Sequence, residues 1–152
     1  MVITLYEQEL YNDFRSKSHY EVAEITDAEA RYRAEAGTEK QGEIVRCIRD
    51  GIAQARHRCL RFLDETITPE ADDSYATDDV EYVFSFPVSE RRAIGKAEPL
   101  AAALHNFVVH YAMSKFYSSV SQMELSNKHS LQAVENGTDI DRLLYTKQPP
   151  RV

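Results

Sequence analysis

Apolar residues recur every three or four positions through most of this chain, which is the spacing that places them on one face of a helix. Four segments show the pattern: Leu5–Ala36, with an expected break near Ile25 and Thr26, Glu39–Glu65, Pro99–Val120 and Ser121–Tyr145. They predict a mainly α protein, a bundle of four to five helices. Because 152 residues are a natural size for one hydrophobic core, we expect a single helical domain over residues 1–152.

An alternating pattern with a period of two replaces the helical one in the stretch VEYVFSFPV. Tyr82, Phe84 and Phe86 fall on one side of it, so one short β segment is expected near residues 80–87. Pro87 has no N–H to donate, so the strand ends there or lies at a sheet edge. A lone strand leaves its backbone groups unpaired, and the sequence shows no second convincing strand. A strand from another subunit is therefore one candidate partner.

Hydroxyl residues mark the expected helix starts. Thr26, Thr38 and Ser121 are each followed three positions later by Glu or Gln, which is the capping-box arrangement. Gly37 is expected to end the preceding helix in the left-handed conformation. The Asn-Gly pair at 136–137 leaves two alternatives, since it either interrupts the last helix or lies within a continuous one.

The segment LHNFVVHYAMSKFY, residues 104–117, has almost no polar face. At ~100° per residue, apolar side chains lie on opposite sides of this helix and polar ones fill only narrow gaps. A helix that is apolar nearly all round is buried on every side, which takes most of the other helices or a second subunit. Together with the unpaired strand, this predicts a homo-oligomer. The residues expected to pack in the core or at an interface are Phe84, Phe86, Leu104, Phe107, Val108, Tyr111 and Phe116.

The histidines of this segment are its candidates for metal binding or proton transfer. His105 and His110 point ~140° apart on a helix, so they cannot hold one metal ion as an i, i+4 pair does. His19, His57 and His129 have no cysteine or carboxylate at ligand spacing. We therefore expect histidines that hydrogen-bond locally, and no metal site.

No other residue pattern indicates catalysis. Cys47 and Cys59 would lie ~18 Å apart on one helix, too far for a disulfide, and are expected to be buried thiols. No serine lies in a glycine-flanked turn, and no glycine-rich loop is present to hold a phosphate. The sequence predicts no catalytic residue, no cofactor and no enzyme activity.

Charge limits the partners further. The net charge is −7, whereas affinity for phosphates requires clustered Lys and Arg, so nucleic acid is not an expected partner. The arginines between Glu39 and Glu65 are expected to pair with acids of this chain or of a neighbouring subunit. The N-terminus lacks a signal-peptide pattern, and no apolar run approaches ~20 residues, so we expect a cytoplasmic chain without a membrane partner.

Two segments fall outside the helical pattern. An acidic loop is expected at residues 66–79, and its sequence EADDSYATDD carries carboxylates that could chelate a hard cation. It lacks the ligand order and the glycine of an EF-hand loop, so an exposed loop is the expected structure. The last segment, TKQPPRV, is a predicted tail over residues 146–152, because its two prolines exclude further helix.

The order of the stretches FSFPVSERR, LHNFVVHYAMSKFY and DIDRLLYTKQPPR resembles that of small proteins encoded in phage and prophage structural gene clusters. More loosely, it resembles the helical head–tail connector, or head-completion adaptor, proteins of tailed phages. The resemblance covers roughly residues 80–151. It implies a non-enzymatic subunit of the virion neck, a helical bundle that assembles as a ring against portal or tail proteins. Such a subunit is cytoplasmic before assembly and part of the virion afterwards.

Two other functions stay open from the sequence. A generic helical protein–protein interaction module, without any phage connection, would show the same apolar helix and lack of an active site. A small metal-binding protein would use His105, His110 or the acidic loop. Portal, terminase or tail genes beside this gene would favour the phage protein over the interaction module. Metal analysis of the purified protein tests the metal-binding alternative.

Overall fold

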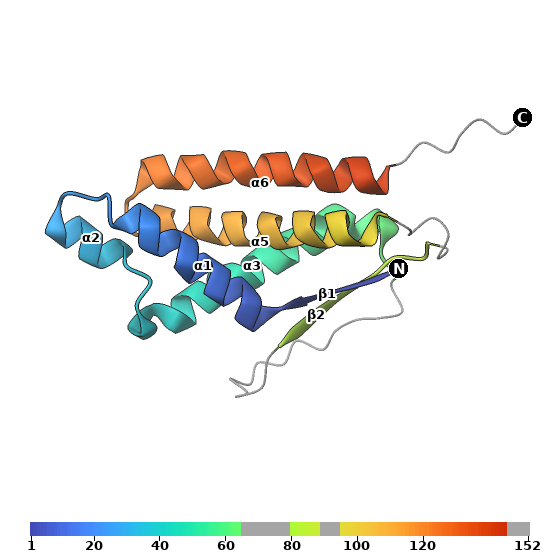
Figure 1. The fold of residues 1–152 in the computed structure, drawn as a ribbon, viewed down its shortest axis with the longest axis horizontal. Helices are drawn as coiled ribbons and strands as arrows, with labels where there is room; N and C mark the ends of the chain where they lie inside the picture. The colour runs from blue at the N-terminus through green and yellow to red at the C-terminus, as the bar shows by residue number, and fades with distance from the viewer. Residues whose placement is uncertain (65–79, 89–94, 146–152) are drawn as a thin grey trace, which may run out of the picture.

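The computed structural model describes residues 1–64, 80–88 and 95–145. These residues form a mainly helical fold, as predicted, with five α-helices and one two-stranded antiparallel sheet. In chain order the elements are β1 (Val2–Tyr6), α1 (Glu7–Val22), α2 (Ala28–Ala34), α3 (Gln41–Cys59), β2 (Glu81–Ser85), α5 (Ala97–Ser119) and α6 (Met123–Leu144) (Figure 1). Short 3₁₀ turns at Thr38–Lys40 and Leu60–Phe62 flank α3. The predicted acidic loop 66–79 and tail 146–152 lie outside the described residues.

The partner of the predicted strand comes from the N-terminus of the same chain. Strand β1 pairs antiparallel with β2, and Ile3 lies opposite Phe84 while Leu5 lies opposite Tyr82. The expectation that the chain has no second convincing strand is therefore wrong, and the candidate strand from another subunit is not needed. Its error was to place Leu5 at the start of a helix, although the stretch VITLY alternates buried and exposed positions and is rich in β-branched residues.

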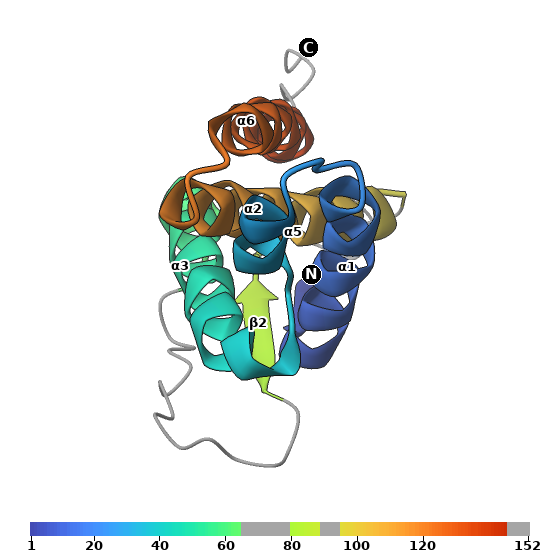
Figure 2. The same ribbon diagram turned by 90° about the vertical axis from the view of Figure 1, so that its left-hand side faces the viewer.

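Helix α5 forms the centre of the fold. Helix α6 lies along one side of it, and α1 and α3 lie against the opposite side (Figure 1, Figure 2). Buried side chains occupy every face of α5, from Leu104 and Val108 to Phe116 and Tyr117. The apolar segment thus finds its cover within its own chain. Neither the apolar helix nor the strand requires a second subunit.

The contact between α3 and α5 is close enough to involve the backbone. Gly51 lies at this crossing, and a Cβ there would be 2.9 Å from the carbonyl oxygen of Val108. Glycine is therefore the residue that lets the two helices approach to this distance. Ile48 and Ile52, which flank it on α3, are buried at the same contact layer.

Two of the predicted arginine pairs form within the described part of the chain. Arg49 of α3 lies 3.3 Å from Glu7, and Arg58 lies 2.9 Å from Asp141 on α6. Arg56 differs, because its guanidinium carbon lies 5.0 Å from the centre of the Phe84 ring and no ion pair joins it to an acid among the described residues. These side chains connect α3 to α1, to the sheet and to α6.

Helix α6 is unbroken from Met123 to Leu144, so the continuous alternative is correct. Gly137 lies within it, beneath the guanidinium group of Arg58. A Cβ at this position would come within 2.5 Å of the guanidinium carbon. The missing side chain lets Arg58 donate to the Gly137 carbonyl at 3.0 Å while it also contacts Asp141.

The structure corrects the predicted caps at the first two helix starts. Asp27, one residue after Thr26, caps α2, and its carboxylate accepts a hydrogen bond from the Glu29 N–H at 3.1 Å. Thr38 begins a 3₁₀ turn and makes no side-chain cap. Gly37 has a φ of −71°, so it is extended and not left-handed as predicted.

The third predicted cap, Ser121, instead ends the helix before it. Its φ is 63°, and its N–H donates to the carbonyl of Ser118, while the Gln122 N–H donates to the carbonyl of Tyr117. These two bonds form the Schellman motif that closes many helices, usually with glycine at the left-handed position. The capping-box prediction failed here because the same residue is needed to finish α5.

Candidate functional site

A chain of hydrogen bonds joins three helices in the interior. His129 of α6 is 1% exposed, and its Nε2 lies 2.8 Å from both carboxylate oxygens of Glu21 on α1. Its Nδ1 lies 2.9 Å from Nδ1 of His110 on α5. We call these three residues the histidine cluster. The cluster ties α1, α5 and α6 to one another.

The contact between the two Nδ1 atoms restricts how protons are distributed. One nitrogen must carry a hydrogen and the other must accept it. When both rings are neutral, His110 donates to His129, and the Nε2–H of His129 donates to Glu21. When His129 is an imidazolium, it donates to both neighbours. Protonating both rings would place two donors face to face, so the pair accommodates one positive charge at most.

The surroundings shift the pKa values of the two outer members. Burial, together with the positive charge that His129 and Lys17 can carry, lowers the pKa of His110 to about 4. Burial alone would raise the pKa of Glu21, but the hydrogen bond and charge of His129, aided by Lys128, lower it overall. Near pH 7, Glu21 is therefore ionised and His110 is neutral.

Tyr117 packs against the histidine cluster from α5. Its ring is buried, and its centre lies 5.6 Å from that of His129, with the two planes 27° apart. The Tyr117 hydroxyl donates to Oγ of Ser18, which is 1% exposed, at 3.2 Å. Burial raises the pKa of Tyr117, so the hydroxyl keeps its proton and remains a donor. The buried polar groups here bond to one another.

His105 has its own partner on α1. Its Nε2 lies 2.8 Å from a carboxylate oxygen of Asp13, which also contacts Lys17 at 2.7 Å. Although partial burial opposes it, these two contacts lower the pKa of Asp13. His105 and His110 thus belong to separate groups, as their ~140° separation around the helix predicts.

Burial limits the chemistry that the histidine cluster can perform. A carboxylate that orients an imidazole also stands behind many catalytic bases. Here, however, both nitrogens of His129 are already bonded and the ring is 1% exposed. Among the residues that the structure describes, no group of three or more His, Cys, Asp or Glu could hold a metal ion. The arrangement suits a polar link that fixes helix positions.

Cys59 is buried as predicted, whereas Cys47 is only partly buried. Burial, with the negative charge of Glu43 and Asp50, raises the pKa of Cys47 to about 11. Burial also raises the pKa of Cys59 to about 12, with a smaller contribution from Asp141. Both thiols are free. Since the thiolate is the reactive form, neither is activated for nucleophilic attack at neutral pH.

The structure places the predicted packing residues in two environments. Six of them are buried in the core, namely Phe84, Phe86, Leu104, Phe107, Val108 and Phe116. Tyr111 is only half-buried and stacks near Phe107, with ring centres 6.2 Å apart.

Sequence reasoning missed Glu21 and His129, because their partners lie on other helices. The sequence could have indicated that His129 is buried, because it lies on the same face of the predicted helix as Ala133, Gly137 and Ile140.

Tyr111 lines a groove of about 410 Å³ between α5 and α6. Phe107 also lines it, and four serines contribute hydroxyls, namely Ser114, Ser118, Ser126 and Ser130. Arg58 lies 6.0 Å from the centre of the Phe107 ring, and Lys115 lies 5.6 Å from that of Tyr111. Both cations have acidic partners, since Arg58 contacts Asp141 and Lys115 lies 3.6 Å from Asp50. Neither cation is therefore held ready for an anionic ligand.

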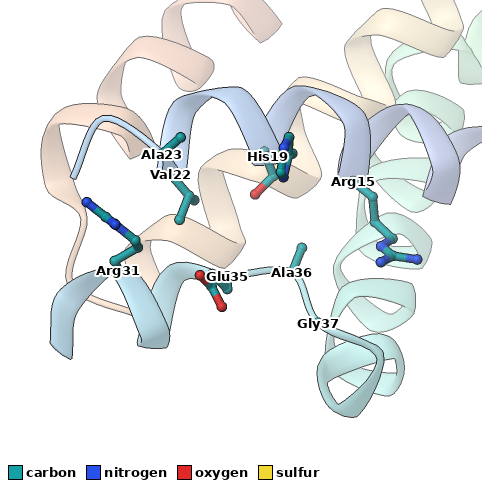
Figure 3. Close-up of a pocket in the computed structure, with 9 residues that line it drawn as sticks. Arg15, His19, Val22, Ala23, Arg31, Glu35, Ala36 and Gly37 are labelled. Carbon is teal, nitrogen blue, oxygen red and sulfur yellow. The ribbon is translucent and has the colours of Figure 1, made fainter. Parts of the chain in front are cut away.

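A second cavity, of about 460 Å³, lies between α1 and the segment that contains α2. Its charged lining residues do not converge on one point. The guanidinium groups of Arg15 and Arg31 lie at opposite ends and point away from each other (Figure 3). Arg31 donates from Nε to the carbonyl of Ile25 at 2.9 Å. The cavity thus lacks the converging polar groups of a specific ligand site.

The outer face of α6 exposes large apolar side chains. Along this helix and the residue after it they are Met123 (55% exposed), Leu131 (68%), Val134 (59%) and Tyr145 (55%). The buried face of α6, from Ser126 to Ile140, packs on α5. In the part of the chain that the structure describes, no other element lies over the outer face (Figure 2).

Comparisons of the chain with protein-family models, with curated proteins and with solved structures find no match. No helix among residues 1–64, 80–88 and 95–145 is long and apolar enough to span a membrane. The fold is thus a helical bundle with the histidine cluster inside. On the outer face of α6 it carries an apolar row, which consists of Met123, Leu131, Val134 and Tyr145.

Proposed function

We propose that this chain is a non-enzymatic structural or assembly subunit of phage origin, similar in role to a head–tail connector. In this proposal it works by associating with itself and with other neck or tail proteins. The observation that carries the proposal is the outer face of α6, where Leu131 and Val134 are 68% and 59% exposed. Contiguous exposed apolar patches mark sites of protein contact, and Leu131 and Val134 lie about one helical turn apart.

The interior supports the same proposal. The buried His129 and the partly buried Glu21, whose side chain is 16% exposed, bond to each other instead of lining an open cavity. Fully bonded polar networks rigidify a core and specify its packing. A rigid bundle suits a subunit that has to present one fixed surface to its neighbours.

The phage assignment rests on the sequence resemblance over residues 80–151, which includes β2, α5 and α6. The apolar row of α6 lies inside that part of the chain. The first half supplies β1, α1 and α3, which cover β2 and the inner side of α5. The first half of the chain thus supports the fold, and the second half presents the surface that contacts partners.

The proposal is tested by deleting the gene in a lysogen that can be induced. We expect portal, terminase or tail genes beside it, and lysates that contain unjoined heads and tails in place of infectious particles. Re-expressing the wild-type chain should restore the titre. A normal titre from the deletion strain, or metabolic genes on both sides, would contradict the proposal.

A further inference from the structure

The outer edge of α6 carries a charge pattern that reverses about the middle of the helix. Glu124, Lys128, Glu135 and Arg142 are all exposed and lie within ~40° of one another around the helix axis. From the N-terminus their signs read negative, positive, negative, positive. Read from the C-terminus, the same row has the opposite sign at each place. Asp139 is also exposed beside this row and lies 3.9 Å from Arg142. Lys128 lies 3.7 Å from Glu21, so each cation of the row also has an acidic neighbour within its own chain.

The exposed apolar residues follow the same symmetry. Leu131 and Val134 lie on either side of the helix midpoint, next to the charged edge. Met123 and Tyr145, each 55% exposed, lie at the two ends. A helix that meets a reversed copy of itself therefore matches apolar residues with apolar residues and unlike charges with each other.

We propose that α6 pairs antiparallel with α6 of a second copy of this chain, about a two-fold axis near residues 132 and 133. Leu131 packs on Val134 of the second copy, Glu124 faces Arg142, and Lys128 faces Glu135. Each contact occurs twice, because a two-fold interface uses the same surface on both copies. This inference rests on the proposed function for self-association, and it names the surface and the orientation.

Charge selects the orientation. In a parallel pair the two-fold axis runs along the helices, so the charged edges of the two copies lie on opposite sides of the seam and the two rows do not meet. In the antiparallel pair every member of the row meets an unlike charge. Charges that flank an apolar seam set partner choice and orientation in paired helices.

The fold leaves the outer face of α6 available for this contact. The inner face packs on α5, whose opposite side is covered by α1 and α3 (Figure 2). The sheet lies on the far side of the bundle from α6 (Figure 2). Two copies paired through α6 would thus expose both sheets at the outside of the dimer, away from the shared seam.

The test is a charge exchange followed by sedimentation velocity of the full chain. Glu124→Arg alone and Arg142→Glu alone each bring like charges together twice, and each should weaken dimerisation ~10-fold or more. The double variant Glu124→Arg with Arg142→Glu restores unlike pairs and should return to within ~3-fold of the wild type. Glu81→Arg, the same change on exposed β2, is the matched control and should leave dimerisation unchanged.

A further variant removes the centre of the seam. Leu131→Glu should abolish dimerisation, and circular dichroism should show an unchanged helical fold because this side chain is 68% exposed. Oligomers that resist all these changes would overturn the pairing and leave the proposed function intact. A double variant that stays as weak as the single ones would also overturn it. A dimer that behaves as expected, from a gene without virion neighbours, would contradict only the proposed function.

Discussion

His110 and His129 share a hydrogen bond between their Nδ1 atoms, at 2.9 Å, although they lie 19 residues apart on neighbouring helices. Glu21 extends the link to α1 through the other nitrogen of His129. The bond needs one donor and one acceptor, so it is sensitive to the charge of both rings. The packing of α6 on the bundle should therefore depend on pH.

Acidification should destabilise the protein between pH 6.5 and about 4. The folded chain lowers the pKa of His110 from 6.5 to about 4, so in this window the unfolded chain binds a proton that the folded chain does not. Stability present above pH 6.5 is thus lost as the pH falls. Glu21, whose pKa is also lowered in the folded state, adds to the loss below 4.5.

Urea denaturation at pH 7 and pH 4.5 measures this effect. The variant His110→Gln should lose less free energy of unfolding between the two pH values than the wild type does. His57→Gln, at an exposed position on α3, is the control and should keep the wild-type difference. An undiminished pH dependence in His110→Gln would rule out the histidine pair as its source.

Phe107→Ala should lower the free energy of unfolding by ~3–5 kcal/mol, because it removes a buried ring and leaves a cavity. Phe107 is 6% exposed and stacks near Tyr111. His105→Gln and His110→Gln should each cost less and leave the metal content unchanged. Chemical denaturation beside elemental analysis checks all three variants. A Phe107→Ala protein as stable as the parent, or zinc lost from a histidine variant, would refute this expectation.

Gly51→Ala should destabilise the chain by ~1–3 kcal/mol although alanine favours helices, since the new Cβ would overpack the contact with α5. It would meet the Val108 carbonyl oxygen at 2.9 Å. Gly42→Ala on the same helix is the matched control, because no atom lies within 4 Å of a Cβ there. Gly42→Ala should gain up to ~1 kcal/mol. Thermal melts of the two variants should therefore shift in opposite directions.

Ser121→Gly should stabilise the chain by ~1 kcal/mol, since glycine adopts a positive φ without the clash of a Cβ. Ser121 has a φ of 63° at the end of α5. The same substitution three residues earlier, Ser118→Gly, lies within the helix and should destabilise instead. Equal losses in both variants would mean that Ser121 is not held in the left-handed conformation.

Periodicity in the sequence predicts α3, α5 and α6 well, because each has a long apolar pattern that only a helix satisfies. It fails for β1, where five residues precede a helix without a turn signal and their pairing depends on β2, far along the chain. It also fails for Ser121, whose hydroxyl fits a cap equally well in the adjacent helix. Local patterns cannot decide such cases, since the tertiary contacts choose between them.

The histidine cluster shows the same limit for polar residues. Spacing along one helix correctly separates His105 from His110. It does not predict that Glu21 of α1 and His129 of α6 contact each other and His110, because these contacts form only when the helices pack together. The apolar row on the outer face of α6 is visible in the sequence only once the inner face of that helix is known.

Sedimentation equilibrium of the wild-type chain at neutral pH tests the central claim, self-association through α6, most directly. The account predicts an average mass that rises reversibly from 17.4 kDa towards twice that value as concentration increases from ~1 to ~100 μM. Leu131→Glu should hold the mass at 17.4 kDa over the same range. A wild-type mass that stays at 17.4 kDa throughout would contradict the account.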